Sequence, residues 1–304
     1  MVDQDSKQES QQWLTYLETC IEEQQDELDA DSEAAYYEAV RDMLLNQGDS
    51  DEAISQAIER CYNHYMTSID AENARWQEDD VEVKRHFEYD IFGILNSVTN
   101  IVFETVRELP YPDPKNETLA QFLIGMAHNI PPGCRKKDAD TASDFDGIQT
   151  GARDPWDASS LEGMSLDLEK PGLEKVAHAS LNTTALIARL FQADLLGTSG
   201  PRWVVHDLKS AFEMEHEGDI TKHILKQAQV LAAANYVLIA GDAFAKVIAL
   251  TKMARIYKID VEKWKSWTSK FKEMADAVGE DARWNLKERL QKAHDKMVEM
   301  QKVL

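Results

Sequence analysis

The feature that most constrains the fold is the helical spacing of apolar residues along almost all of the 304-residue chain. Runs in which apolar and polar residues alternate, as in strands, are scarce. Glycine and proline, 13 and 8 in number, stand mainly between the periodic segments. The sequence therefore predicts an all-α fold of about ten to twelve helices, arranged as a bundle or as a stacked antiparallel array.

Composition divides the chain into four parts. Residues 1–80 form an acidic N-terminal helical region, 81–130 the first core helices, and 166–304 a C-terminal helical core. Residues 131–165 are rich in Gly, Asp, Ser and Pro, which predicts a flexible loop or insertion with little apolar material to offset the cost of ordering. We expect the segments 81–130 and 166–304 to make one compact domain.

The charge of the chain is strongly negative and uneven. The net charge is -22, and the first 100 residues hold 6 Lys and Arg against 25 Asp and Glu. Such a field repels phosphate backbones and anionic lipids, so nucleic acid and membranes are not expected partners. A protein partner that binds the acidic helices, or a small molecule, remains open.

The sequence points to a cytoplasmic, reduced environment. The start, MVDQDSKQESQQW, has neither the basic nor the apolar region of a secretory signal. The longest uncharged run, Gln227 to Gly241, is 15 residues, whereas a bilayer-spanning helix needs about 20. Three widely separated cysteines form no CxxC pattern, as in reduced intracellular proteins.

A candidate site lies in the stretch RWVVHDLKSAFE, from Arg202 to Glu213. A helical wheel places Asp207 within the apolar arc that contains Trp203, and places His206, Lys209, Ser210 and Glu213 on the opposite, polar side. Asp207 is therefore expected to be at least partly buried. A buried carboxylate is costly unless a cation pairs with it.

The preceding helix offers such a cation. In SLNTTALIARLF, Asn182 and Arg189 share a face, and Arg189 is placed to reach Asp207 or Glu213. One interpretation is a structural bridge between neighbouring helices. The other is a polar pocket floor that orients a ligand, with candidate ligand-binding residues Asn182, Arg189, Trp203, His206, Asp207, Glu213 and Tyr236.

The sequence gives no motif for a cofactor or a metal. There is no GxSxG, no GxxxxGK[ST], no GxGxxG and no HExxH. Glu213 and His216 have the Glu-x-x-His spacing of di-iron bundles, but that site needs the motif twice and no second copy is present. We therefore predict no cofactor and no metal.

Three segments carry a family resemblance: NTTALIARL (Asn182 to Leu190), HDLKSAFE (His206 to Glu213) and AAANYVLIAG (Ala232 to Gly241). From about Phe87 onward, the chain resembles a filamentous-fungal family known only as a domain of unknown function. The resemblance implies a soluble, intracellular, all-helical fungal protein, and it supplies no catalytic residue. His206, Lys209 and Ser210 stand where the family pattern has tryptophan, arginine and aspartate.

Two functions remain. The first is a non-catalytic protein that binds a protein partner or a small molecule between its helices. The second is an enzyme or accessory protein of fungal specialised metabolism, in which Arg189 holds an acidic group of the substrate and Asp207 acts as acid or base. An apolar cavity of about 300 Å³ or more beside these residues would favour the second function, and a filled core the first.

Overall fold

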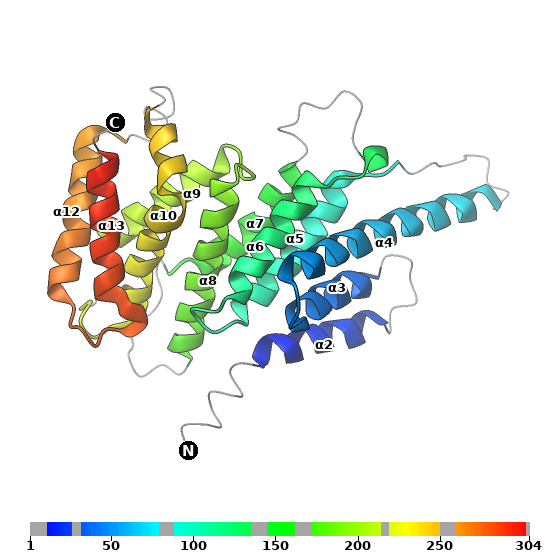
Figure 1. Cartoon of the computed structure of the whole chain (residues 1–304), viewed down its shortest axis with the longest axis horizontal. Coiled ribbons are helices and arrows are strands. Elements are labelled where there is room, and N and C mark those ends of the chain that lie inside the picture. The colour runs from blue at the N-terminus through cyan, green and yellow to red at the C-terminus, as the bar shows by residue number, and fades with distance from the viewer. Residues whose placement is uncertain are drawn as a thin grey trace, which may run out of the picture. The chain divides into compact units, whose positions relative to one another are not determined.

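The all-α prediction is confirmed. The computed structural model describes residues 11–25, 32–78, 88–134, 145–161, 172–213, 219–249 and 259–301. These residues form eleven α-helices and two short 3₁₀ helices, with no strand among them (Figure 1). Their contacts define two compact units, one of Met1–Leu109 with Pro114–Pro155 and one of Pro110–Asp113 with Trp156–Leu304.

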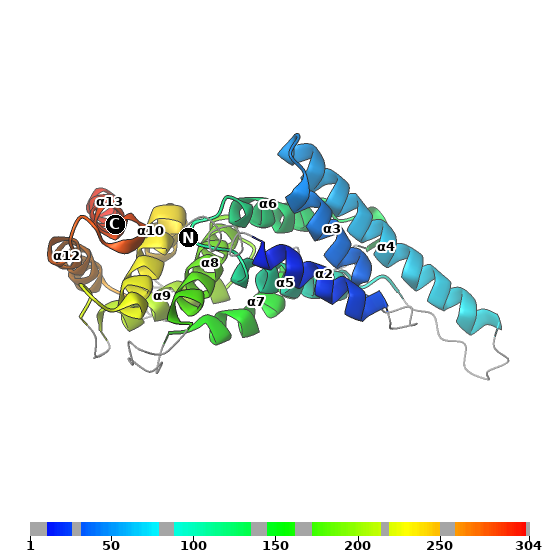
Figure 2. The same cartoon turned by 90° about the horizontal axis from the view of Figure 1, so that it is seen from below.

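The first unit contains the acidic helices, three of which (α2, α3 and α4) are the blue helices of Figure 2. Helix α2 packs on α3 and α5, and α4 packs on α3 and α6. The division groups α5, α6 and the start of α7 with the acidic region, and the expected grouping of 81–130 with 166–304 stays a prediction. Its helices are α2 (Gln12–Gln25), α3 (Ala34–Leu45), α4 (Ser50–Glu78), α5 (Ile91–Arg107), α6 (Lys115–His128) and the start of α7 (Asp146–Ser159).

Helix α7 (146–159) lies within the segment 131–165 that was expected to be a loop, while residues 135–144 and 162–165 lie outside the described residues. Its sequence, DGIQTGARDPWDAS, is polar and contains Pro155 inside the helix. Its glycines lie against α5: a Cβ on Gly147 would approach the Phe92 carbonyl oxygen to 2.6 Å, and one on Gly151 would approach Thr99 Cβ to 2.8 Å. The glycines thus permit a close helix approach, where the sequence suggested loop composition.

The second unit is built on the long helix α10. This helix packs against α8, α9 and α13, and α13 packs in turn against α12 (Figure 1). The unit contains α8 (Leu173–Gln192), α9 (Ser199–Phe212), α10 (Ile224–Ala249), α12 (Val261–Ala277), the 3₁₀ helix η3 (Arg283–Asn285) and α13 (Leu286–Met300).

Helix α10 runs through Gly241 without a break. A Cβ on Gly241 would lie 3.1 Å from side-chain atoms of Lys296 and Met300, so the glycine allows α13 to approach. By length and composition, Ile224–Val247 passes the test for a membrane-crossing helix, but 61% of that window is buried inside the structure. The central helix of a folded unit has the same features.

Candidate functional site

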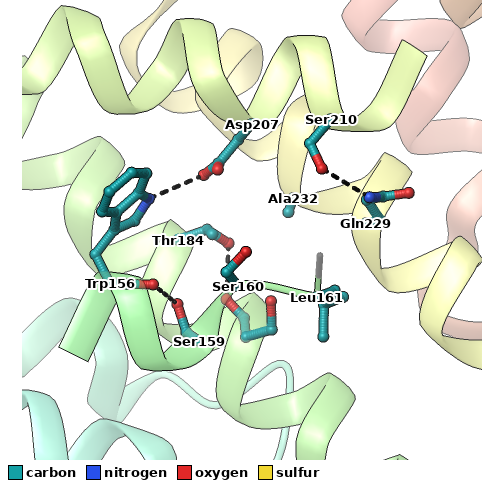
Figure 3. Close-up of a pocket in the computed structure, with 10 residues that line it drawn as sticks. Trp156, Ser159, Ser160, Leu161, Thr184, Asp207, Ser210, Gln229 and Ala232 are labelled. Carbon is teal, nitrogen blue, oxygen red and sulfur yellow. Dashed lines mark hydrogen bonds between the residues drawn. The ribbon is translucent and has the colours of Figure 1, made fainter. Parts of the chain in front are cut away.

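A small polar pocket lies between the C-terminal end of α7 and helices α8, α9 and α10 (Figure 3). Its cavity volume is about 20 Å³. A buried water requires about 10–15 Å³ on the same measure, so the cavity holds one or two groups the size of water. The lining residues are Trp156, Ser159, Ser160, Leu161, Ser180, Thr184, Asp207, Ser210, Gln229 and Ala232.

Asp207 of α9 supplies the negative charge of this pocket. Its side chain is 16% exposed, which confirms the predicted partial burial. One carboxylate oxygen accepts a hydrogen bond from Trp156 Nε1 at 3.4 Å, and the other lies 3.2 Å from His206 Nδ1. Among the described residues, no Lys or Arg forms an ion pair with Asp207.

Aromatic rings surround the Asp207 carboxylate. The Trp156 ring stacks on Trp203 with centroids 5.3 Å apart, and His206 meets Trp156 edge-on at 5.1 Å. Tyr236 of α10 is 1% exposed. Burial first, and then the charge of Asp207, raise the pKa of the Tyr236 hydroxyl well above its usual value. Hydrogen bonding of that hydroxyl to the Asp207 carboxylate acts in the same direction.

Two of the pocket hydroxyls donate to backbone carbonyls. Ser159 donates its proton to the Trp156 carbonyl at 2.8 Å, and Thr184 donates to the Ser180 carbonyl at 3.0 Å. Their remaining lone pairs are the hydrogen-bonding capacity left for the pocket. Ser210 accepts a hydrogen bond from Gln229 Nε2 at 2.9 Å. The lining therefore offers hydroxyl lone pairs beside a carboxylate.

A lysine lies behind this lining. The Lys226 ammonium donates to the Ala211 carbonyl at 3.1 Å and to Gln229 Oε1 at 3.0 Å. Burial lowers the pKa of Lys226. These contacts hold Gln229 so that its amide nitrogen is directed toward Ser210.

The predicted bridge from Arg189 to a carboxylate is wrong in its choice of cation. Glu213 pairs instead with Lys263 Nζ at 2.6 Å and accepts a hydrogen bond from Trp267 Nε1 at 2.7 Å. Both partners lie on α12, about fifty positions further along the chain. Arg189 Nη1 donates to the Ala185 carbonyl at 3.3 Å. The pairing depends on which helix neighbours α9, and the wheel gives no information on that.

The seven candidate residues thus fall into separate places. Asp207 is one of them, and three others, Trp203, His206 and Tyr236, lie around its carboxylate. Glu213 turns to α12, while Asn182 donates to the Pro110 carbonyl at 3.4 Å.

Two positions on α9 were misjudged from the wheel. His206 was expected on the polar side, away from Asp207, yet the side chains of these two neighbours meet. Ser210, expected to be exposed, is 6% exposed. Trp156 was missed because its segment looked like a loop. The only sequence signal for Trp156 was that it closely precedes Ser159 and Ser160, which line the same pocket.

The structure also bears on a metal site. No cluster of three or more His, Cys, Asp or Glu side chains capable of holding a metal occurs among the described residues. His216 lies outside those residues.

Comparison with known proteins places the chain in a family. A family model described as "Protein of unknown function (DUF3632)" matches residues 100–286, which is more than half of the chain. The matched segment covers both ends of the pocket lining, from Trp156 to Ala232. No curated protein and no solved structure matches the chain. This chain belongs to the DUF3632 family.

Proposed function

We propose that this protein is a non-catalytic binding protein whose pocket between α7, α8, α9 and α10 recognises the primary ammonium group of a small molecule. The observation that carries the proposal is the Asp207 carboxylate, which is largely buried, accepts a hydrogen bond from Trp156 Nε1 and lies beside His206 and the pocket hydroxyls. A charge in that environment favours a cation as partner. An ammonium group offers three donors, which suits the carboxylate and the serine and threonine lone pairs.

The size of the pocket supports recognition of one group. A cavity of about 20 Å³ accepts an ammonium group, and the remainder of the ligand then lies outside it. The alternative, an enzyme or accessory protein with an apolar pocket, called for a cavity of about 300 Å³ or more. The polar lining and the small volume favour binding over that alternative. A protein partner for the acidic helices, a cytoplasmic location and a fungal origin stay predictions.

Asp207→Asn tests this function. The change removes the charge and keeps the shape of the side chain. In calorimetric titrations with methylammonium and 1,4-diaminobutane, we expect the Kd to rise at least about tenfold, which corresponds to about 1.4 kcal/mol. Tetramethylammonium has no N–H donor and is expected not to bind.

Asp242→Asn is the matched control, since the same chemical change is made on a side chain that is 77% exposed. It should leave the Kd unchanged. Equal affinity of the native protein and Asp207→Asn, or no saturable binding by the native protein, would refute the proposal.

A second prediction concerns the buried Tyr236 hydroxyl. Because this hydroxyl is buried and hydrogen-bonds to the Asp207 carboxylate, Tyr236→Phe should lower the free energy of unfolding by about 1 kcal/mol in the absence of amine. Tyr62→Phe should have the same sign, because the Tyr62 hydroxyl donates to the buried Met126 carbonyl at 2.6 Å. Urea unfolding followed by circular dichroism measures both. A gain of stability in Tyr236→Phe would mean that the hydroxyl has no partner.

A further inference from the structure

A second polar cluster lies in the same unit, where the segment Pro110–Asp113 meets α10 and α13. Its centre is Asn235 of α10, which is fully buried. The Asn235 side-chain oxygen accepts hydrogen bonds from Tyr111 at 3.1 Å and from Arg289 Nη2 at 2.6 Å. The Arg289 guanidinium also lies over the Tyr111 ring, 5.7 Å from its centroid.

Two donors in this cluster are unused. The Asn235 amide nitrogen and Arg289 Nε are buried and have no hydrogen-bond partner in the described residues. A buried donor without an acceptor costs about 1–3 kcal/mol. Since the Asn235 oxygen already accepts two hydrogen bonds, a flip of the amide would sacrifice both. The two groups without partners, the Asn235 amide nitrogen and Arg289 Nε, are therefore both donors. A bound acceptor would satisfy them.

Arg289 brings a positive charge to the cluster. Within the described residues, no carboxylate forms an ion pair with Arg289. The neighbouring Glu288 pairs with Lys292 at 2.6 Å. Burial raises the pKa of Tyr111, while the charge of Arg289 acts to lower it. An anion would complement this charge, whereas neutral groups alone do not.

The backbone beside Arg289 adopts an uncommon conformation. Trp284 and Asn285 have φ angles of 57° and 55°, a region that side-chain-bearing residues seldom occupy. The strained turn holds the Trp284 ring edge-on to Tyr111, with centroids 6.3 Å apart. Strain of this kind persists only when its surroundings enforce it, and it concentrates at binding sites. The Tyr111 and Trp284 rings together form an aromatic wall beside the Arg289 guanidinium.

We propose that Arg289 and Asn235 bind an oxyanion, a carboxylate or phosphate group carried by a small molecule, beside the wall formed by Tyr111 and Trp284. Guanidinium N–H groups pair with either oxyanion through two parallel hydrogen bonds. The Asn235 amide nitrogen supplies a further donor. The site uses none of the residues that line the ammonium pocket, so it does not depend on the function proposed above.

The test is calorimetric titration of the full chain with sodium phosphate, sodium acetate and sodium benzoate, at ionic strength held constant with sodium chloride. We expect saturable binding of at least one of these anions. In Arg289→Gln the Kd should rise at least tenfold. Arg289→Lys keeps the charge without the planar donor fork, and should bind more weakly than the native protein while remaining folded. Tighter binding of phosphate identifies a phosphate site, and tighter binding of acetate or benzoate a carboxylate site.

Two controls separate the proposal from general charge effects. Arg283→Gln removes a guanidinium that is 51% exposed and pairs with Glu174, so it should leave the Kd unchanged. Asp207→Asn should also leave oxyanion binding unchanged, which distinguishes this site from the ammonium pocket. The proposal is overturned if no anion binds saturably, or if folded Arg289→Lys binds all three anions as tightly as the native protein.

Discussion

Trp264→Ala is expected to lower the free energy of unfolding of the second unit by about 3–5 kcal/mol, the range for truncation of a large buried aromatic side chain. Trp264 of α12 is completely buried. Its Nε1 donates to the Met297 carbonyl of α13 at 3.1 Å, and its ring lies 5.9 Å from that of Phe244 in α10. One side chain thus joins three helices.

Urea unfolding followed by circular dichroism measures the effect in the transition of that unit. Trp264→Phe retains most of the apolar contact and loses the hydrogen bond to Met297, so its cost should be smaller. Val261→Ala, in the same helix but 46% exposed, should change stability by about 0.5 kcal/mol or less. A cost below 1 kcal/mol for Trp264→Ala would show that α12 contributes little to the fold of the unit.

The burial of this core follows directly from apolar periodicity on one helix. Trp264, Trp267 and Phe271 recur at helical spacing, and each is at most 1% exposed. The same reasoning placed Asp207 at the edge of a buried face. In both cases, the side chain's environment is set by its own helix, which a wheel describes.

Charge pairing was not predictable in the same way. The partner of Glu213 is Lys263, which no local pattern connects to it, because pairing depends on the order in which helices pack. Arg189 was chosen as a partner because it lies on the preceding helix in sequence. Helix α8 does pack on α9, and even more extensively on α10, so sequence adjacency was a poor guide to the side-chain partner.

The sequence predicted the part of the candidate site on α9 and missed the part on α7, for a related reason. Trp156 and Ser159 come from α7, whose composition resembles that of a loop. Glycine has two roles, one as a helix breaker and one as a residue that permits close contact. A single sequence does not distinguish these roles. The close approach of α7 to α5 at Gly147 and Gly151 shows that the second role applies here.

Gly147→Ala tests that role. A Cβ at this position would lie 2.6 Å from the Phe92 carbonyl oxygen and 2.9 Å from Leu95 Cβ. Because a backbone oxygen within α5 cannot yield without bending the helix, we expect a loss of about 1–3 kcal/mol in the stability of the first unit. Gly93→Ala is the matched control, since a Cβ on Gly93 would lie 3.9 Å from its nearest neighbour, the Asp90 carboxylate. Alanine there should be neutral or stabilising by up to about 1 kcal/mol. Urea unfolding of both variants decides the matter: if Gly147→Ala is as stable as Gly93→Ala, then α7 does not pack on α5 as closely as the structure shows.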